Sequence, residues 1–464
     1  MTIWVPDLTR YDGPRYQAIA EAIGDAIVAG DLGEGVKLPP QRDLAWRLGV
    51  TVGTVSRAYM LAESRGFVSG EVGRGTYVRA GAGKAGGYVL DPPPADNLVD
   101  LGKNFPGPLI GGLEGALRST FAELSQREGL EQLVQYMPDV GHAAHRAAAA
   151  KWCERVGLKA SPDQVVLAAG GQQALMASLM ALARSGDMVL CEALTYGGLL
   201  DVLRVRELRF EGVSVDARGM VPAALDEVAR RKDAKLVVLQ PTVHNPTAAQ
   251  MDLERRREIV AVARAHDLTL IEDDVYGQLP ADRPPPIAAL APERTVYIAS
   301  ASKCLAPGLR VGWVIAPPAL IERFADAMHV LALSQPPLPA EIFRRWVEDG
   351  TADRLAGELR AEVAARNAIA NQVFAGLQLQ SQPGSFHAYL YLPEPWRREE
   401  FAAACLQSGI RVVTAATFAV GRDPVPHAIR LSLTAVRDRN QLTRHLTTLR
   451  TIIDAGPHGR RLLL

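Results

Sequence analysis

The stretch Thr295–Trp313, TVYIASASKCLAPGLRVGW, is the most informative part of this 464-residue chain. It contains the apolar run TVYIAS and, three residues after it, Lys303 among small residues. Continuous apolar runs of this length are typical of strands that are covered on both faces of a sheet. A lysine at the end of such a strand loses water, which favours the neutral amine that can attack an aldehyde. A surface lysine is the alternative, and this setting argues against it.

The same apolar pattern recurs over much of the chain. The runs are QVVLAAG, MVLCEA, KLVVLQP, LTLIEDD and VGWVIAP, at 164–170, 188–193, 235–241, 268–274 and 311–317. Strands that alternate with helices indicate an α/β fold with a large, mostly parallel sheet. After a helical stretch near 319–376, the runs HAYLYLP, IRVVTA and AIRLSLT indicate a smaller C-terminal α/β part.

Polar residues follow several of these runs. Asp273 and Tyr276 follow LTLIE, and Asn245 follows KLVVLQP in an Asn-Pro-Thr sequence. Gly171 and Gln172 follow QVVLAAG and open a helix whose N-terminal N–H groups suit a phosphate. Alone, each group is explained as an ordinary turn. However, parallel strands end at one edge of the sheet, where the sites of α/β proteins collect.

Together these residues resemble the fold-type I pyridoxal-phosphate enzymes of the aminotransferase class I and II family, over residues 97–455. The resemblance implies that pyridoxal 5′-phosphate is held as an internal aldimine on Lys303. It also implies that Asp273 keeps the pyridine nitrogen protonated, so that the ring acts as an electron sink. Lys303, Asp273 and Tyr276 would be the catalytic residues. The other implied contacts are Asn245 and Tyr276 on the ring oxygen, Tyr196 on the ring face, Gly171, Gln172, Ser300 and Arg310 on the phosphate, Tyr136 on the phosphate of a partner subunit, and Arg430 on the α-carboxylate of an effector or substrate.

The chain departs from this family's pattern at two places. The usual glycine after Asn-Pro-Thr is Ala248, and the usual Leu-Arg after the Tyr136 segment is His145-Arg146. Cofactor binding is still implied, whereas these changes bear on turnover. We therefore do not predict a physiological enzyme activity. A residual aminotransferase half-reaction is the alternative that stays open. His142 and His145 are not interpreted as metal ligands, because no third ligand accompanies them.

The first eighty residues carry a different pattern. Residues 16–29 have apolar side chains at helical spacing, followed by Gly30, and Pro39-Pro40 precedes the short helical run QRDLAWRL. Thr51 is the predicted N-cap of a third helix. A small hairpin is predicted to end at Thr76-Tyr77-Val78. The inward face of the third helix is predicted to consist of Val52, Val55, Tyr59 and Ala62.

Residues 36–78 resemble the GntR-type winged helix-turn-helix. The matching features include Leu38-Pro39, Leu48-Gly49-Val50 and Gly73-Arg74-Gly75-Thr76. The resemblance implies that the third helix enters the major groove of double-stranded DNA with its N-terminal residues at the base edges. A docking domain without DNA is the alternative, but it leaves the Gly-Arg-Gly tip without a purpose. The residues expected to contact bases or phosphates are Arg42, Thr51, Thr54, Ser56, Arg57 and Arg74.

The combination of the two units resembles the MocR subfamily of transcriptional regulators. The predicted domains are 11–80 for DNA binding, 81–96 for a Gly/Ala- and Pro-rich linker, and 97–455 for the aminotransferase-like part. The resemblance implies a head-to-tail homodimer whose DNA binding is modulated by pyridoxal phosphate, by an amino compound, or by both. Two alternatives stay open: a genuine aminotransferase with an accessory N-terminal domain, and a DNA-binding protein whose large domain serves only for dimerisation.

Composition is compatible with this interpretation. The formal net charge is zero, so DNA contacts must come from local placement of charge. The chain has 48% hydrophobic residues, and its four cysteines have neither metal spacing nor a paired pattern. The first residues lack a charged-then-apolar signal pattern. We therefore expect a reduced, cytoplasmic protein.

Overall fold

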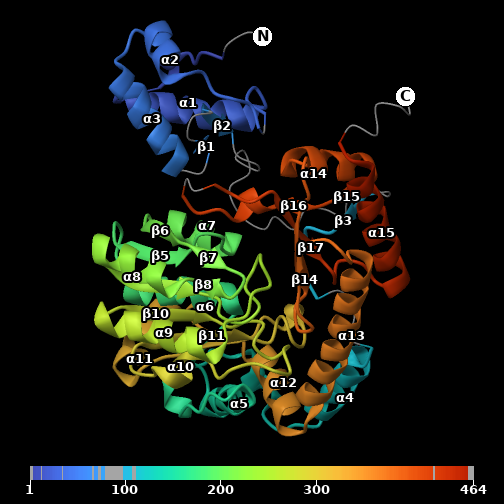
Figure 1. The fold of residues 1–464 in the computed structure, drawn as a ribbon. Helices are drawn as coiled ribbons and strands as arrows, with labels where there is room; N and C mark the ends of the chain where they lie inside the picture. Colours follow the sequence, from blue (N-terminus) through green and yellow to red (C-terminus); the bar gives the residue numbers. More distant parts are fainter. Residues whose placement is uncertain are drawn as a thin grey trace. The chain divides into compact units, whose positions relative to one another are not determined.

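The computed structural model describes residues 4–11, 13–33, 35–64, 67–71, 75–78, 98–106, 111–421 and 424–457. The chain divides into two compact units, Met1–Leu90 with Gly421–Val425, and Asp91–Val420 with Pro426–Leu464 (Figure 1). Each unit is described by itself. The predicted linker at 81–96 lies outside the described residues.

The first unit is a small helical domain with a hairpin. Its elements are η1 (Leu8–Arg10), α1 (Arg15–Ala29), α2 (Gln41–Leu48), α3 (Val52–Ser64), β1 (Val68–Glu71) and β2 (Gly75–Val78). Helix α1 ends at Gly30, whose φ of 84° is left-handed and therefore suits glycine. The two strands are antiparallel, with Val68 opposite Val78. The predicted helices and hairpin are thus present.

Helix α3 confirms one prediction in detail and corrects another. The backbone N–H of Thr54 donates to Thr51 Oγ1 (3.2 Å), so Thr51 is the N-cap. Val55, Tyr59 and Ala62 are buried as predicted, but Val52 is 44% exposed. Val52 has the right spacing for the inward face. As the first residue of α3, however, it extends past the part of the helix that its neighbours cover.

The second unit is built on a seven-stranded sheet. In spatial order its strands are β4 (Val165–Ala168), β12 (Gly312–Ile315), β11 (Thr295–Ser300), β10 (Thr269–Asp273), β9 (Ala234–Leu239), β5 (Met188–Glu192) and β6 (Arg209–Val213). Strand β12 is antiparallel to both neighbours, and the pairs from β11 to β6 are parallel. This arrangement confirms the α/β fold with a mostly parallel sheet.

Helices cover both faces of this sheet because successive side chains point to opposite sides. Val238 and Ile271 pack toward one face with α6, α7 and α11, whereas Val237 and Leu270 pack toward the other with α8, α9 and α10. Helices α5, α12 and α13 cover the rest of the second face, next to Trp313. These helices are α5 (Ala143–Glu154), α6 (Gly171–Leu182), α7 (Gly197–Val205), α8 (Pro222–Arg231), α9 (Leu253–Ala265), α10 (Ile287–Leu290), α11 (Ile321–Ala332), α12 (Pro337–Glu348) and α13 (Thr351–Val373).

A smaller sheet forms the C-terminal part of this unit, beside α13 and α15 (Arg439–Ala455) (Figure 1). Its order is β13 (Leu379–Gln380), β14 (His387–Tyr391), β17 (Ala428–Ser432) and β16 (Val413–Thr414). The run IRVVTA forms two short strands rather than one. Ile410–Arg411 (β15) pairs with Val99–Asp100 (β3), and β16 pairs with β17.

The remaining elements connect these layers. They are α4 (Leu113–Ser125), η2 (Leu130–Val134), η3 (Pro162–Gln164), β7 (Val215–Asp216), β8 (Gly219–Met220), η4 (Pro307–Leu309), η5 (Pro318–Leu320), η6 (Ala415–Phe418), α14 (Arg398–Gln407) and α15 (Arg439–Ala455). Within the described part of the chain, none of the helices has the length and apolarity that crossing a membrane requires.

Candidate functional site

Lys303 lies just beyond β11, where the carboxyl ends of the parallel strands meet. Its Nζ donates a hydrogen bond to the backbone carbonyl oxygen of Asn104 (2.8 Å) and lies 5.7 Å from the centre of the Tyr276 ring. Burial lowers the pKa of Lys303 to about 8, and the positive charge of Arg430 acts in the same direction. At neutral pH roughly one lysine in ten is then neutral, compared with far fewer at an ordinary lysine pKa.

Asp273 ends strand β10 and is buried. Its Oδ2 accepts a hydrogen bond from Gln240 Nε2 (2.7 Å). Burial raises the pKa of Asp273 to about 6, and the hydrogen bond from Gln240 limits this rise. The carboxylate is therefore still ionised at neutral pH, as it must be to hold a protonated pyridine nitrogen.

Asn245, Tyr276 and Arg430 converge on the same place from three elements. Arg430 lies on β17, and its Nη1 donates to Asn245 Oδ1 (2.8 Å), while its Nη2 donates to the carbonyl oxygen of Gly102. The Tyr276 hydroxyl accepts from Asn104 Nδ2 (2.8 Å). The buried guanidinium of Arg430 thus stands beside the amide that the sequence assigned to the ring oxygen.

A cradle of small residues lies at the start of α6. Gly170 has φ of 95°, and a Cβ there would lie 2.5 Å from Arg310 Nη2, while one at Gly171 would lie 2.7 Å from Val275 Cγ1. Arg310 Nη2 donates to the carbonyl oxygen of Ala169 (2.7 Å). Arg310 is itself left-handed, with φ of 52°, a strained conformation typical of functional positions.

Two serines complete this cradle. Ser300 Oγ and Ser302 Oγ are 2.9 Å apart, and Arg310 Nη1 approaches Ser302 Oγ at 3.5 Å. Glycine backbone N–H groups, two hydroxyls and an exposed guanidinium at a helix N-terminus form a donor set that fits a phosphate.

The structure joins most of the other predicted residues to this site. Gln172 Nε2 donates to the carbonyl oxygen of Gly198 (2.9 Å), and the Tyr196 ring occupies the space that a Cβ at Gly198 would need. Tyr136 is different, because it is 79% exposed in the single chain and the described contacts do not connect it to the cluster.

Several site residues were missed by the sequence interpretation. Gln240 contacts both Asp273 and the backbone N–H of Asn245 (3.2 Å), and Glu192 Oε1 accepts from the backbone N–H of Gln240 (2.7 Å). Burial raises the pKa of Glu192 to about 8. Both residues follow apolar strands, so the rule that selected Asp273 could have found them. Asn104 and His387 carry no comparable signal.

The arrangement fits pyridoxal 5′-phosphate. This cofactor requires a phosphate site, a partly neutral lysine and an ionised aspartate. The chain has all three, and its phosphate site has room only because Gly170 and Gly171 lack side chains. When bound, the cofactor supplies an electron sink. The residues of the chain would hold its phosphate at Gly171 and Arg310, and its ring nitrogen at Asp273.

The two departures from the family pattern have structural consequences. Ala248 has φ of 59°, a left-handed conformation that explains the usual glycine and costs an alanine about 1–2 kcal/mol. His145 is buried and its Nε2 lies 3.2 Å from Glu341 Oε2, within a group of arginines. His142 lies beside it, with ring centres 5.5 Å apart. The described residues gather no group of three side chains that could hold a metal ion.

In the first unit, the predicted DNA contacts lie at the starts of two helices. Arg42 is exposed in the first turn of α2, while Thr51 and Arg57 are exposed at and near the start of α3. Thr54 and Ser56 are half-buried beside them. Arg74 lies outside the described residues. The five described residues therefore lie on or next to two consecutive helices, α2 and α3, as in a helix-turn-helix that binds DNA.

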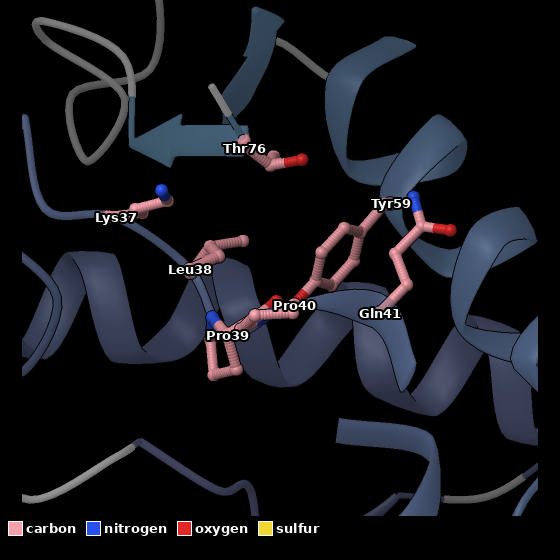
Figure 2. A pocket seen from close by; sticks show the side chains of 8 residues that line it. Lys37, Leu38, Pro39, Pro40, Gln41, Tyr59 and Thr76 are labelled. Carbon is pink, nitrogen blue, oxygen red and sulfur yellow. The ribbon is translucent and has the colours of Figure 1, made fainter. Parts of the chain in front are cut away.

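The first unit also has a cavity of about 280 Å³ (Figure 2). It is bounded by the start of α2, by Tyr59 of α3 and by Thr76 of β2. The Tyr59 hydroxyl donates to the carbonyl oxygen of Pro39 (2.8 Å), so α3 is tied to the segment that leads into α2. This contact fixes the relative position of the two helices that carry the predicted DNA contacts.

Comparisons with known proteins assign both units. Residues 112–449 match the model of the family "Aminotransferase class I and II", and residues 15–78 match "Bacterial regulatory proteins, gntR family". The chain is 30% identical to the uncharacterised HTH-type transcriptional regulator YdeF of Bacillus subtilis, over 97% of each chain. It is 29% identical to the uncharacterised HTH-type transcriptional regulator YdcR of Escherichia coli, over 88% of this chain and 93% of that one.

Solved structures resemble the second unit. The crystal structure of the α-aminoadipate aminotransferase LysN from Thermus thermophilus, complexed with N-(5′-phosphopyridoxyl)-L-leucine, superposes with a TM-score of 0.69. The identity is 26%, and the match covers 80% of this chain and 94% of that one. The match supports pyridoxal phosphate as the cofactor of the second unit.

Proposed function

Because this chain belongs to the aminotransferase class I and II family and carries a gntR-type domain, as MocR regulators do, we propose that ligand binding at Lys303 and Arg430 controls its binding to DNA. The chain is a transcriptional regulator that depends on pyridoxal phosphate and binds DNA through its first unit. The proposal concerns which residues bind the ligand and the DNA, and how the two events are connected.

DNA recognition is proposed to use the start of α3. Its capped N-terminus and the exposed Arg57 would approach base edges in the major groove, and Arg42 would hold a phosphate. Arg74 is proposed as a further contact from the hairpin tip. Since the chain has no net charge, these few local cations would provide the attraction to DNA. We propose 11–80, 81–96 and 97–455 as the domain limits.

The proposed connection between the ligand site and the DNA-binding unit rests on the segment that follows the predicted linker. Lys303 Nζ donates to the carbonyl oxygen of Asn104, and Arg430 Nη2 donates to that of Gly102. Both ligand-binding side chains therefore hold one short segment, 98–106, which is the first described stretch after residues 81–97.

Ligand binding would change both of these contacts. Attachment of the cofactor would use the Lys303 amine, which could then no longer donate to the carbonyl oxygen of Asn104. A ligand carboxylate at Arg430 would compete with the carbonyl oxygen of Gly102 for the same donors. We propose that the backbone of segment 98–106 would then be held differently, and that this change reaches the DNA-binding unit. The ligand can shift DNA binding only if it favours one of the resulting arrangements.

A homodimer is proposed from the exposed apolar residues of the second unit. We propose that a partner copy covers them. A head-to-tail pair would let Tyr136 reach the phosphate of the partner subunit and would present two DNA-binding units. A cytoplasmic location is proposed because the operator DNA must be accessible. The exposed residues are Phe121, Leu130, Val134, Tyr136, Val330 and Leu333.

The proposal is tested by measuring cofactor absorbance and DNA binding on the same samples. The full chain is titrated with pyridoxal phosphate in the presence of a labelled fragment of its own upstream DNA. We expect a visible cofactor band and a DNA affinity that changes with it, and neither response in Lys303→Ala. A cofactor band with DNA affinity that is independent of the cofactor would contradict the proposed connection.

Genuine aminotransferase activity is the second candidate. The pairing of buried Arg430 with Asn245 fits the carboxylate of an amino acid substrate as well as that of an effector. Incubation with a panel of amino acids, followed at the cofactor absorbance, separates the two. Repeated turnover would favour the enzyme, whereas at most a single half-reaction would favour the regulator.

A further inference from the structure

A directed chain of hydrogen bonds includes the hydroxyl of Tyr276. His387 Nε2 lies 3.0 Å from the carbonyl oxygen of His244, and His387 Nδ1 lies 3.0 Å from Asn104 Nδ2. Asn104 Nδ2 also lies 2.8 Å from the Tyr276 hydroxyl. Asn104, His387 and Tyr276 are all buried, so water does not compete for these hydrogen bonds.

The direction of each bond follows from the carbonyl oxygen of His244. A carbonyl only accepts, so His387 Nε2 must carry a proton. Burial lowers the pKa of His387 to about 3, with the charge of Arg430 acting in the same direction, so the ring is neutral. Its Nδ1 is therefore an acceptor, and the group of Asn104 that faces it must be the NH₂.

The same NH₂ group faces Tyr276, so its second N–H donates to the tyrosine oxygen. A hydroxyl that receives a hydrogen bond becomes a better donor, because bonds in a chain polarise one another. Reversing the Asn104 amide would place its oxygen against the lone pair of His387 Nδ1. His387 thus fixes the Asn104 amide, and the amide fixes the role of Tyr276.

We propose that Asn104 is a positioning residue, which holds the Tyr276 hydroxyl as a hydrogen-bond donor to the ring oxygen of the bound cofactor. This inference rests on the proposed function, because it assumes that pyridoxal phosphate occupies the site. Asn104 would act through Tyr276 and not on the reacting atoms. Before the cofactor is attached, the backbone carbonyl of Asn104 also accepts from Lys303.

The spectrum of the lysine-linked cofactor provides the test. A hydrogen-bond donor to the ring oxygen stabilises the negative charge on that oxygen. It thereby lowers the pH midpoint at which the visible band of the cofactor changes. The charged groups that act on Lys303 are Asp273, Arg430 and Arg310, and a change of Asn104 to alanine leaves them in place. We expect Tyr276→Phe to raise the midpoint by about one pH unit, the equivalent of one hydrogen bond to a charged group.

Asn104→Ala is expected to raise the midpoint in the same direction, and to have almost no effect when Tyr276→Phe is already present. Asn104→Asp keeps the size of the side chain, replaces the donor by an acceptor and adds a negative charge near Lys303, so it should raise the midpoint at least as far. The matched control is Asn371→Ala in α13, whose Nδ2 donates to the carbonyl oxygen of Asn367 (2.9 Å). It should leave the midpoint unchanged.

Three results would overturn the inference. Equal shifts from Asn104→Ala with and without Tyr276→Phe would show that Asn104 does not act through Tyr276. If both Asn104 variants unfold at the temperature of the wild type and their midpoints are unchanged, Asn104 has no positioning role. A wild-type protein without any cofactor band would overturn this inference and the proposed function together.

Discussion

Replacing Gly170 by alanine is expected to weaken the hold on the cofactor phosphate while leaving the lysine and aspartate in place. The added Cβ would lie 2.5 Å from Nη2 and 2.9 Å from Cζ of Arg310, so the guanidinium must move away from the cradle. Charge-assisted hydrogen bonds are worth about 1.5–3 kcal/mol. Their loss corresponds to a Kd for pyridoxal phosphate that is about 10- to 150-fold higher.

The alanine also costs folding stability, and this effect must be separated from the first. Gly170 has φ of 95° and ψ of 173°, a region that is essentially restricted to glycine, so an alanine there costs about 1–3 kcal/mol. Gly186 supplies a matched control, because its φ is 86° and a Cβ there meets nothing within 4 Å. Both substitutions should therefore lower the free energy of unfolding, Gly170→Ala at least as much as Gly186→Ala, but only Gly170→Ala should lose cofactor affinity.

The assay compares pyridoxal phosphate with pyridoxal, which lacks the phosphate. Each variant is titrated with both compounds at the visible band, and its free energy of unfolding is measured in urea. We expect Gly170→Ala to bind pyridoxal as the Gly186→Ala control does. Wild-type affinity of Gly170→Ala for pyridoxal phosphate would refute the assignment of Gly170 and Arg310 to the phosphate. An equal loss for both compounds would refute it as well.

Three further predictions concern the lysine, the DNA and the dimer. The rate at which pyridoxal phosphate attaches to Lys303 should rise about tenfold per pH unit and flatten above a pH of about 8, because the pKa of this lysine is lowered to about 8 and only the neutral amine reacts; stopped-flow absorbance would show a continued rise to pH 10 if the lysine were ordinary. Arg57→Ala should weaken specific DNA binding by about 1–3 kcal/mol if Arg57 contacts a base, measured by fluorescence anisotropy; equal losses on random DNA would assign Arg57 to a phosphate instead. Val134→Glu should dissociate the proposed dimer in sedimentation, whereas Val205→Glu should not, although the two valines are 75% and 73% exposed; a dimer that survives Val134→Glu would place the interface elsewhere.

Local pattern was sufficient for the helices of the first unit and for six of the seven strands of the large sheet, but not for β6. The helix QRDLAWRL begins and ends where its flanking Pro40 and Gly49 indicated, since caps and backbone preferences act within a few residues. The apolar runs became those strands of the large sheet. Asp273 and Lys303 could be selected because parallel strands deliver their C-terminal residues to one edge.

Contacts between distant segments could not be derived in this way. Lys303 and Asn104 are 199 residues apart, and Asn104 and His387 are 283 apart, yet they share one network. Nothing near Asn104 in the chain marks it as a site residue. The exposure of Val52 and the division of IRVVTA between two sheets likewise depend on which neighbours cover each residue. Periodicity and capping are local properties of the chain, whereas burial and hydrogen-bond direction are set by whichever groups the folded chain brings into contact.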